Sequence, residues 1–135
     1  WTTAGSVETP VSNIDLAPTI VDLAGLGAEI ADADGRSLRP LLDDSVAGSP
    51  GTGPVLIEFA GDADVPAWRG VRTDAFSYLE HADGTVELYD LAGSLGPADP
   101  WELRNRADDP SYASVRRAPA TGLAELVGGP LRPAP

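Results

Sequence analysis

The stretch that decides the fold is Trp68 to Leu91, WRGVRTDAFSYLEHADGTVELYDL. It contains three short runs rich in aromatic and β-branched residues, and two Asp-containing turns separate them. Gly84 can take the positive φ that a tight hairpin turn needs. The stretch therefore predicts an antiparallel meander of three strands over residues 69–73, 76–81 and 85–91.

A fourth strand is predicted upstream, at residues 54–60, PVLIEFA, because a near-continuous apolar run is typical of a strand buried on both faces. After the meander, residues 101–105 predict a helical turn, and Asp109-Pro110 opens a last helix. Pro119 is expected to kink or divide that helix, because proline cannot donate the helical hydrogen bond. The residues of this helix expected to face the sheet are Tyr112, Val115, Leu123 and Leu126.

The fold class that follows is α+β, with a small antiparallel sheet of about four strands and a C-terminal helix packed on it. Upstream, residues 14–24 predict a short helix, in which Asp15 caps the N-terminus and Asp22 is exposed. A second helical turn is expected at residues 37–42. A helix as short as residues 14–24 needs a surface to lie on. The apolar stripe of this helix consists of Leu16, Ile20, Leu23 and Ala24.

Composition excludes several classes of function. The chain of 135 residues carries a net charge of −12, from 21 acidic and 9 basic residues, which argues against nucleic acid and anionic membranes as partners. With no Cys, it can form neither a disulfide nor a thiolate zinc site, and the sequence assigns no compartment. All the basic residues are Arg, which is typical of a GC-rich bacterial genome. A chain that does not begin with Met is expected to be a piece of a longer protein.

Two blocks resemble the C-terminal end of the sulfatase family, within the alkaline-phosphatase-like superfamily. The first is VSNIDLAPTIVDLAGL followed by GRSLRPLL, within residues 11–42. The second is WRGVRTDAFSYLEH, DGTVELYDL and DPWELRNRADDP, in the family's order. The chain departs from the family pattern at Ser77, where Lys is common, at Arg106, where Leu is usual, and at residues 92–98, which resemble an insertion.

The resemblance implies that residues 1–53 are the tail of a sulfatase α/β domain and residues 54–135 the C-terminal subdomain with the sheet. It places calcium and a formylglycine nucleophile, made from the Cys or Ser of a C/S-x-P-x-R motif, in an N-terminal catalytic domain outside this chain. Attack on sulfur by the hydrated formylglycine, assisted by the cation, is the implied reaction of the whole enzyme. This chain has no such motif. It is therefore expected to be inactive alone, and to complete the fold and line the cleft for a small or saccharide sulfate ester.

Three residues are candidates for substrate binding, and none is predicted to be catalytic. Trp68 can stack on a sugar or aryl ring, although core packing is the simpler interpretation. Arg69 and Arg72 suit sulfate oxygens, and pairing with the many carboxylates is the structural alternative. Because they lie three positions apart on a strand, they face opposite sides, and at most one can serve a given cleft.

No metal site is predicted. The single histidine, His81, is interpreted as a strand-end residue. Asp32 and Asp34 resemble part of a calcium loop, but no Glu completes it at the required distance. The last hairpin also carries acidic residues, for which a turn and a solvated face are a simpler interpretation than a calcium cluster. These residues are Asp83, Glu87 and Asp90.

Two other functions stay open at this point. One keeps the superfamily and changes the reaction to phosphodiester or phosphonate hydrolysis, which the nucleophile upstream would discriminate. The other is a free-standing binding or interaction module. A module predicts that the apolar stripe is buried within this chain, whereas a fragment predicts that the stripe is exposed, or covered by a second copy in an oligomer.

Overall fold

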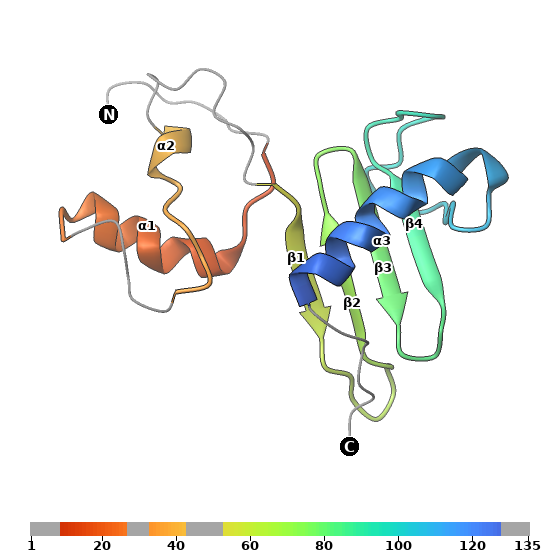
Figure 1. Ribbon diagram of the computed structural model, residues 1–135, viewed down its shortest axis with the longest axis horizontal. Coiled ribbons are helices and arrows are strands. Elements are labelled where there is room, and N and C mark those ends of the chain that lie inside the picture. Colours follow the sequence, from red (N-terminus) through yellow and green to blue (C-terminus); the bar gives the residue numbers. More distant parts are fainter. Residues whose placement is uncertain (1–8, 27–32, 43–52, 128–135) are drawn as a thin grey trace. The chain divides into compact units, whose positions relative to one another are not determined.

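The computed structural model describes residues 9–26, 33–42 and 53–127. The chain divides into two compact units, residues 1–53 and residues 54–135, each described here by itself (Figure 1). That the first unit is the tail of an α/β domain stays a prediction. None of the helices in the described ranges is long and apolar enough to cross a membrane.

The first unit is built around helix α1 (Leu16–Leu23), which follows a 3-10 turn, η1 (Asn13–Asp15). The side chain of Asp15 does not cap α1 as predicted. It reaches back one turn, and its Oδ2 accepts a hydrogen bond from the Ser12 backbone N–H at 3.0 Å. The helix ends at Leu23, and Gly25, two residues later, takes a φ of +71°. The predicted second helical turn is confirmed as α2 (Arg39–Leu42).

The second unit contains a four-stranded antiparallel sheet in the order β1-β2-β3-β4. This confirms the predicted fold class and the hairpin meander. The fourth predicted strand forms at the edge of the sheet, and none of its residues is fully buried. The prediction that it is buried on both faces is wrong, because Val55, Ile57 and Phe59 lie on the face of the sheet that points away from the C-terminal helix and are only partly covered. The strands are β1 (Val55–Phe59), β2 (Trp68–Arg72), β3 (Phe76–His81) and β4 (Val86–Asp90).

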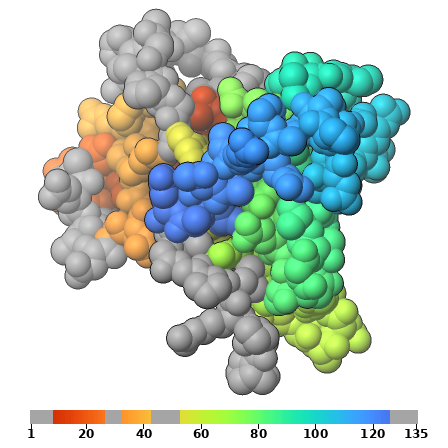
Figure 2. Space-filling view, turned by 45° about the vertical axis from the view of Figure 1, so that its right-hand side comes forward, coloured from red at the N-terminus to blue at the C-terminus, as the bar shows by residue number. Residues whose placement is uncertain are grey.

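The core lies between the sheet and α3 (Ala113–Val127). In Figure 2 the blue atoms of α3 lie against the green atoms of the sheet. Tyr112, in the 3-10 turn η2 (Pro110–Tyr112), and Leu123 of α3 are both buried there, as predicted. The Leu126 side chain lies outside the described residues. The sheet contributes one cross-strand row, Leu56, Val71, Tyr78 and Leu88.

Pro119 does not divide α3, which continues as one helix through it. Proline removes one helical hydrogen bond. The helix ends are nevertheless fixed. At the start, the Asp109 side chain accepts a hydrogen bond from the Ser111 N–H at 3.0 Å, and in the last two turns the buried Leu123 holds the helix on the sheet. Tertiary packing therefore overrides the local preference, as it commonly does.

A segment without helix covers the outer edge of β4. The Asn105 side chain accepts a hydrogen bond from Leu88 N–H at 3.0 Å and donates one to the Val86 carbonyl at 3.0 Å. The Arg106 N–H donates to the Leu88 carbonyl at 2.7 Å. The predicted helical turn at residues 101–105 is wrong, because side chains rather than a helical ladder satisfy the backbone here.

Candidate functional site: the open face of the sheet

The two faces of the sheet differ in what covers them. Val71, Tyr78 and Leu88 point toward α3, so the residues between them along each strand point to the other side. No described helix of the second unit packs on that other side, which we call the open face. The open face consists of Val55, Ile57, Phe59, Trp68, Gly70, Arg72, Ser77, Leu79, His81, Glu87 and Tyr89.

Trp68 lies on the open face at the start of β2. Its register partners are Phe59 of β1 and His81 of β3. The Trp68 and Phe59 rings pack with their centroids 6.2 Å apart and their planes tilted by 36°. The indole is half-buried. It therefore belongs to an aromatic pair already, while part of its surface stays accessible.

Arg69 lies on the other face, with the residues that point toward α3. Its register partner is Glu80, and the two side chains form an ion pair at 3.6 Å. Only 11% of the Arg69 side chain is exposed. The strand geometry therefore separates Arg69 from Trp68 and Arg72, as the three-residue spacing predicts, and the three candidates do not form one site.

Arg72 lies on the open face and forms an ion pair with Glu102. Glu102 has a φ of +57°, which is uncommon for a residue with a side chain. It lies between two strongly exposed apolar residues, Trp101 at 80% and Leu103 at 78%. The guanidinium of Arg72 thus already has a carboxylate partner, with which a sulfate group would have to compete.

Sequence reasoning missed a polar cluster on β4 and the end of β3, on the same open face. Glu87 receives two contacts there, one between its Oε1 and His81 Nε2 at 2.9 Å, and one from the Tyr89 hydroxyl to its Oε2 at 2.6 Å. Burial and the hydrogen bond to Glu87 raise the pKa of Tyr89 well above its ordinary value of 10. Alternation along β4 places Glu87 and Tyr89 on one face, so the signal was present in the sequence.

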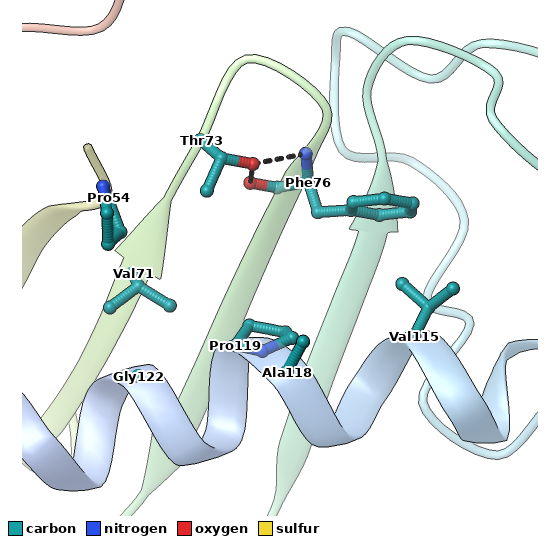
Figure 3. A pocket seen from close by; sticks show the side chains of 8 residues that line it. All are labelled: Pro54, Val71, Thr73, Phe76, Val115, Ala118, Pro119 and Gly122. Carbon is teal, nitrogen blue, oxygen red and sulfur yellow. Dashed lines mark hydrogen bonds between the residues drawn. The ribbon is translucent and has the colours of Figure 1, made fainter. Parts of the chain in front are cut away.

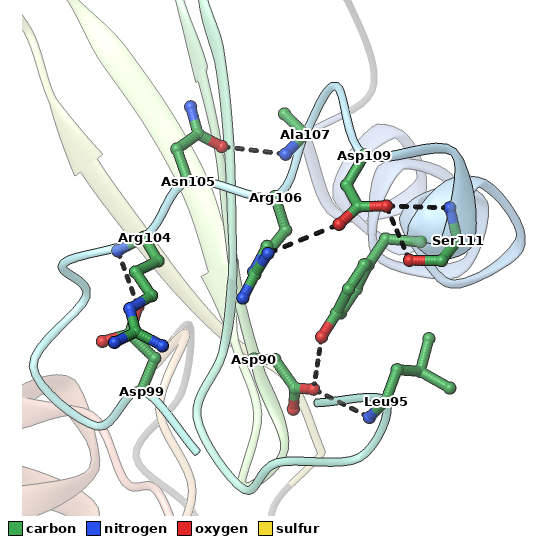
Figure 4. Close-up of polar contacts among 10 residues, drawn as sticks. Asp90, Leu95, Asp99, Arg104, Asn105, Arg106, Ala107, Asp109 and Ser111 are labelled. Carbon is green, nitrogen blue, oxygen red and sulfur yellow. Dashed lines mark hydrogen bonds and ion pairs between the residues drawn. The ribbon is translucent and has the colours of Figure 1, made fainter. Parts of the chain in front are cut away.

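Asp90 is the most connected buried group of this unit (Figure 4). Its carboxylate accepts hydrogen bonds from Ser94 N–H at 2.7 Å, from Leu95 N–H at 2.8 Å and from the Tyr112 hydroxyl at 3.0 Å. Burial tends to raise the pKa of Asp90, but these hydrogen bonds outweigh it and hold the pKa below its ordinary value. The residue therefore anchors a loop and a helix to the end of β4.

An apolar cavity of about 420 Å³ lies between α3 and the sheet (Figure 3). Its one polar side chain, Thr73, is already engaged, because the hydroxyl donates to the Phe76 carbonyl and accepts from the Phe76 N–H. The cavity thus offers no group for catalysis or for binding a charge. It is lined by Pro54, Val71, Thr73, Phe76, Val115, Ala118, Pro119 and Gly122.

In the first unit, α1 turns its polar face inward. The Thr19 hydroxyl accepts from Leu38 N–H at 2.8 Å, and Asp15 Oδ1 accepts from Arg36 N–H at 3.0 Å. Asp22 accepts from the Ser37 hydroxyl at 2.6 Å and pairs with Arg39 at 3.2 Å, so the prediction that it is an exposed helix position is wrong. The polar residues of the first resemblance block therefore hold the G-R-S-L-R segment against the helix.

The opposite, apolar face of α1 is exposed. The exposed fraction is 56% for Leu16 and 66% for Ile20, and Leu23 is exposed as well. A surface helix normally buries its apolar stripe and shows its polar face to water. The amphipathicity of α1 is thus the reverse of what a free-standing module requires.

Within the described ranges, no three His, Cys, Asp or Glu side chains are placed to hold a metal ion. The hairpin acids have separate tasks: Asp83 accepts from Thr85 N–H at 2.8 Å, Glu87 contacts His81, and Asp90 is buried. Asp32, of the partial calcium loop, lies outside the described residues.

Comparisons with known proteins agree with the resemblance seen in the sequence. A choline-sulfatase of Rhizobium meliloti (strain 1021) is 38% identical over 104 residues, which make up 76% of this chain and 19% of that protein. The structure of a 2-O GAG sulfatase matches with a TM-score of 0.70 and 28% identity, over 84% of this chain and 24% of that chain. The phosphonate monoester hydrolase of Agrobacterium radiobacter matches with a TM-score of 0.61 and 30% identity, again over 84% and 24%.

The chain thus spans about a fifth to a quarter of the length of the proteins that it matches. The sequence profile of the family described as N-sulphoglucosamine sulphohydrolase, C-terminal, matches residues 2–127, which is nearly the whole chain. This chain therefore belongs to that family of sulfatase C-terminal domains.

Proposed function

We propose that this chain is the C-terminal portion of a hydrolase of sulfate esters, here called the full-length protein. In this proposal the chain completes the fold, lines one side of the substrate cleft and is inactive alone. The substrate is a small or saccharide sulfate ester. The match to a C-terminal family, together with the small share of each relative that the chain spans, supports an N-terminal part that precedes it.

The observation that carries the proposal is the reversed amphipathicity of α1. Its polar face is used within the first unit, while Leu16 and Ile20 are more than half exposed. Covering an apolar side chain contributes about 1.5–3 kcal/mol, so an apolar face of this size is expected to pack against something. A free-standing module would bury the stripe, whereas the stripe is exposed on the first unit, which supports the interpretation as part of a larger protein.

The catalytic groups are proposed for the N-terminal part. The residues present here do not fit calcium, because no acidic cluster of three or more is placed to hold it in the described ranges. They do not fit formylglycine either, because the chain has no Cys and no Ser-x-Pro-x-Arg motif. We therefore derive no catalytic step within this chain. The proposed contribution of this chain is to position side chains that face the cleft. The candidates for such side chains are Trp68 and Arg72.

A comparison of two proteins tests the proposal. The full-length protein and residues 1–135 alone are assayed with 4-nitrophenyl sulfate in the presence of calcium. We expect turnover by the full-length protein and none by the isolated chain. Turnover that copurifies with the isolated chain at every step would contradict the proposal. So would a coding sequence with no C/S-x-P-x-R motif upstream of Trp1.

Phosphonate or phosphodiester hydrolysis is the second candidate, and the similarity to the Agrobacterium phosphonate monoester hydrolase favours it specifically. The same full-length protein is assayed with a phenylphosphonate monoester at equal concentration. If kcat/KM is higher for the phosphonate than for the sulfate, phosphonate hydrolysis becomes the assigned activity in place of sulfate ester hydrolysis.

A further inference from the structure

We infer that the apolar cavity between α3 and the sheet is a binding site for an uncharged apolar small molecule that carries an aromatic ring or a short alkyl chain. The inference goes beyond the proposed function, because Val71 of the cavity points to the opposite side of β2 from the candidate substrate-binding residues Trp68 and Arg72. Three features of the cavity carry the inference, namely its size, the chemistry of its lining and the way α3 is held above it.

The first feature is the size of the cavity, whose volume is about 420 Å³. Protein interiors are close-packed and contain few voids larger than a water molecule. A cavity of about 150 Å³ that is lined by aliphatic and aromatic side chains is enough to bind benzene, and ligand pockets commonly measure about 300–1,000 Å³. The cavity is therefore large enough for an aromatic ring with an alkyl substituent.

The second feature is the chemistry of the lining. None of the eight described residues that line the cavity is charged, and the hydroxyl of Thr73 is already hydrogen-bonded to the Phe76 backbone. Phe76 supplies an aromatic ring, and Val71 and Val115 supply branched aliphatic groups (Figure 3). A charged or strongly polar molecule would lose its hydration here without gaining a partner, which is unfavourable. The lining therefore selects an uncharged apolar ligand.

The third feature is the way α3 is held above the cavity. Tyr112 and Leu123, which are 2% and 0% exposed, fix the helix on the sheet before and after the stretch that lines the cavity. Within that stretch, Ala118 and Gly122 are small, and a Cβ at Gly122 would meet nothing within 4 Å. The helix cannot move closer to the sheet without displacing the two buried residues, so the sequence itself keeps the cavity open.

The cavity is also accessible from outside the protein. Two of its lining residues, Pro54 and Ala118, are exposed, whereas Val71 is 1% exposed. A ligand can therefore enter without unfolding of the sheet, and removal of its apolar surface from water favours binding. A segment of another protein would bring backbone N–H and C=O groups, which need hydrogen-bond partners that this lining does not offer. The occupant that the lining favours is therefore a small molecule.

The first test measures binding of 4-fluorotoluene to the wild-type full-length protein, from the broadening of the fluorine NMR signal of the probe. We expect a Kd of about 1 mM or tighter. The matched probe 4-fluorobenzamide has the same ring with an amide in place of the methyl group, and it should bind at least about tenfold more weakly, because the amide would be buried without a partner. An absence of 4-fluorotoluene binding, or equal binding of the two probes, would overturn the inference.

The second test uses variants that place the probe in this cavity. Gly122→Leu adds a side chain to the lining, and Ala124→Leu, the matched control, adds the same side chain at an exposed position of α3. We expect Gly122→Leu to weaken 4-fluorotoluene binding by at least about tenfold and Ala124→Leu to change it by less than about threefold. Equal affinities of wild type and Gly122→Leu would overturn the inference, because the probe would then bind elsewhere.

Ala118→Leu, which changes another lining residue, replaces Gly122→Leu if that variant does not fold, and the same loss of affinity is expected. Because probe binding is measured without turnover, its result is separable from a failure to hydrolyse sulfate esters.

Discussion

Asp90 shows how one carboxylate can order several elements of the second unit. It is 1% exposed, and its hydrogen bonds join the end of β4 to the loop after it and to Tyr112 of η2. A carboxylate is favoured over an amide here, because it offers acceptors to three donors at once. The sequence marks this residue only as part of E-L-Y-D-L, and its burial depends on the insertion-like loop that closes over it.

Asp90→Asn is expected to make stability less dependent on pH in acid. The lowered pKa of folded Asp90 means that its stabilisation is complete above the ordinary value of 3.8 and is lost as pH falls through the lowered pKa. At pH 7 the variant should lose about 1–3 kcal/mol of unfolding free energy. As pH falls through the lowered pKa, the difference in unfolding free energy from wild type should shrink, because Asp90 of the wild type then becomes protonated. Urea unfolding across pH checks this. Asp108→Asn, at an exposed position, is the control. A difference in unfolding free energy between wild type and Asp90→Asn that stays constant at every pH would contradict the prediction.

Gly122→Ala is expected to stabilise the protein. A Cβ at this position of α3 would meet nothing within 4 Å, because Gly122 lines the apolar cavity. Replacing a helical glycine by alanine contributes about 0.5–1 kcal/mol. At Gly70 of β2 the same change should destabilise by about 1–3 kcal/mol, since the Cβ would lie 2.3 Å from the Tyr78 carbonyl oxygen. Thermal unfolding compares the two variants, and a lower Tm for Gly122→Ala would show that the cavity is closed in solution.

At the scale of elements, the sequence predicts the strands and turns that hydrophobic periodicity and turn residues control. It misses the segments whose conformation depends on contacts with side chains distant in the sequence. The meander follows from alternating runs and from Gly84, which has a φ of +88°. The segment after it is mistaken for a helical turn, because the Asp99 carboxylate accepts from the Leu103 and Arg104 N–H groups and replaces a helical ladder. The unbroken α3 is missed for a related reason, since packing on the sheet outweighs the local cost of Pro119.

Asn105→Ala tests whether one side chain holds the segment along β4. The substitution leaves the N–H groups of Leu88 and Ala107 without the acceptor that both now use. We expect a loss of about 1–3 kcal/mol in unfolding free energy and faster amide exchange at Leu88. Asn13→Ala, at an exposed position of η1, is the matched control and should change stability by less than about 0.5 kcal/mol. Unchanged amide exchange at Leu88 would show that the hydrogen bond from the Arg106 N–H to the Leu88 carbonyl is enough to hold the segment along β4.

At the scale of the whole molecule, the candidate site is only partly predictable. Strand alternation alone separates Arg69 from Arg72, and the structure agrees. The partner of Arg69 is its register neighbour Glu80. The partner of Arg72, in contrast, comes from tertiary structure, because Glu102 is thirty positions away and reaches it through a turn with positive φ. Which of these side chains contacts a substrate stays a prediction, since it depends on the N-terminal part.

The isolated chain is expected to self-associate through the exposed stripe of α1. An apolar surface that stays exposed because its intended partner is absent tends to bind another apolar surface. Sedimentation of residues 1–135 should show a mass that rises with concentration, and Ile20→Gln, at a residue 66% exposed, should reduce this rise. Val86→Gln, which changes a half-buried residue packed against the core, is not expected to reduce it. A concentration-independent monomer would show that the stripe is too small to drive association.

The hydrogen bonds along β4 also limit how such sheets can aggregate. Strand edges with unpaired backbone groups are templates for fibres, which grow because each added sheet exposes a new edge. Here Asn105, Arg106 and Asp99 already pair with the Val86 and Asp90 carbonyls and with both backbone groups of Leu88, and β1 forms the other edge of the sheet. Two copies that join β1 to β1 leave no further edge for a third. Edge-to-edge misassembly of this sheet therefore stops at a closed pair instead of propagating into a fibril.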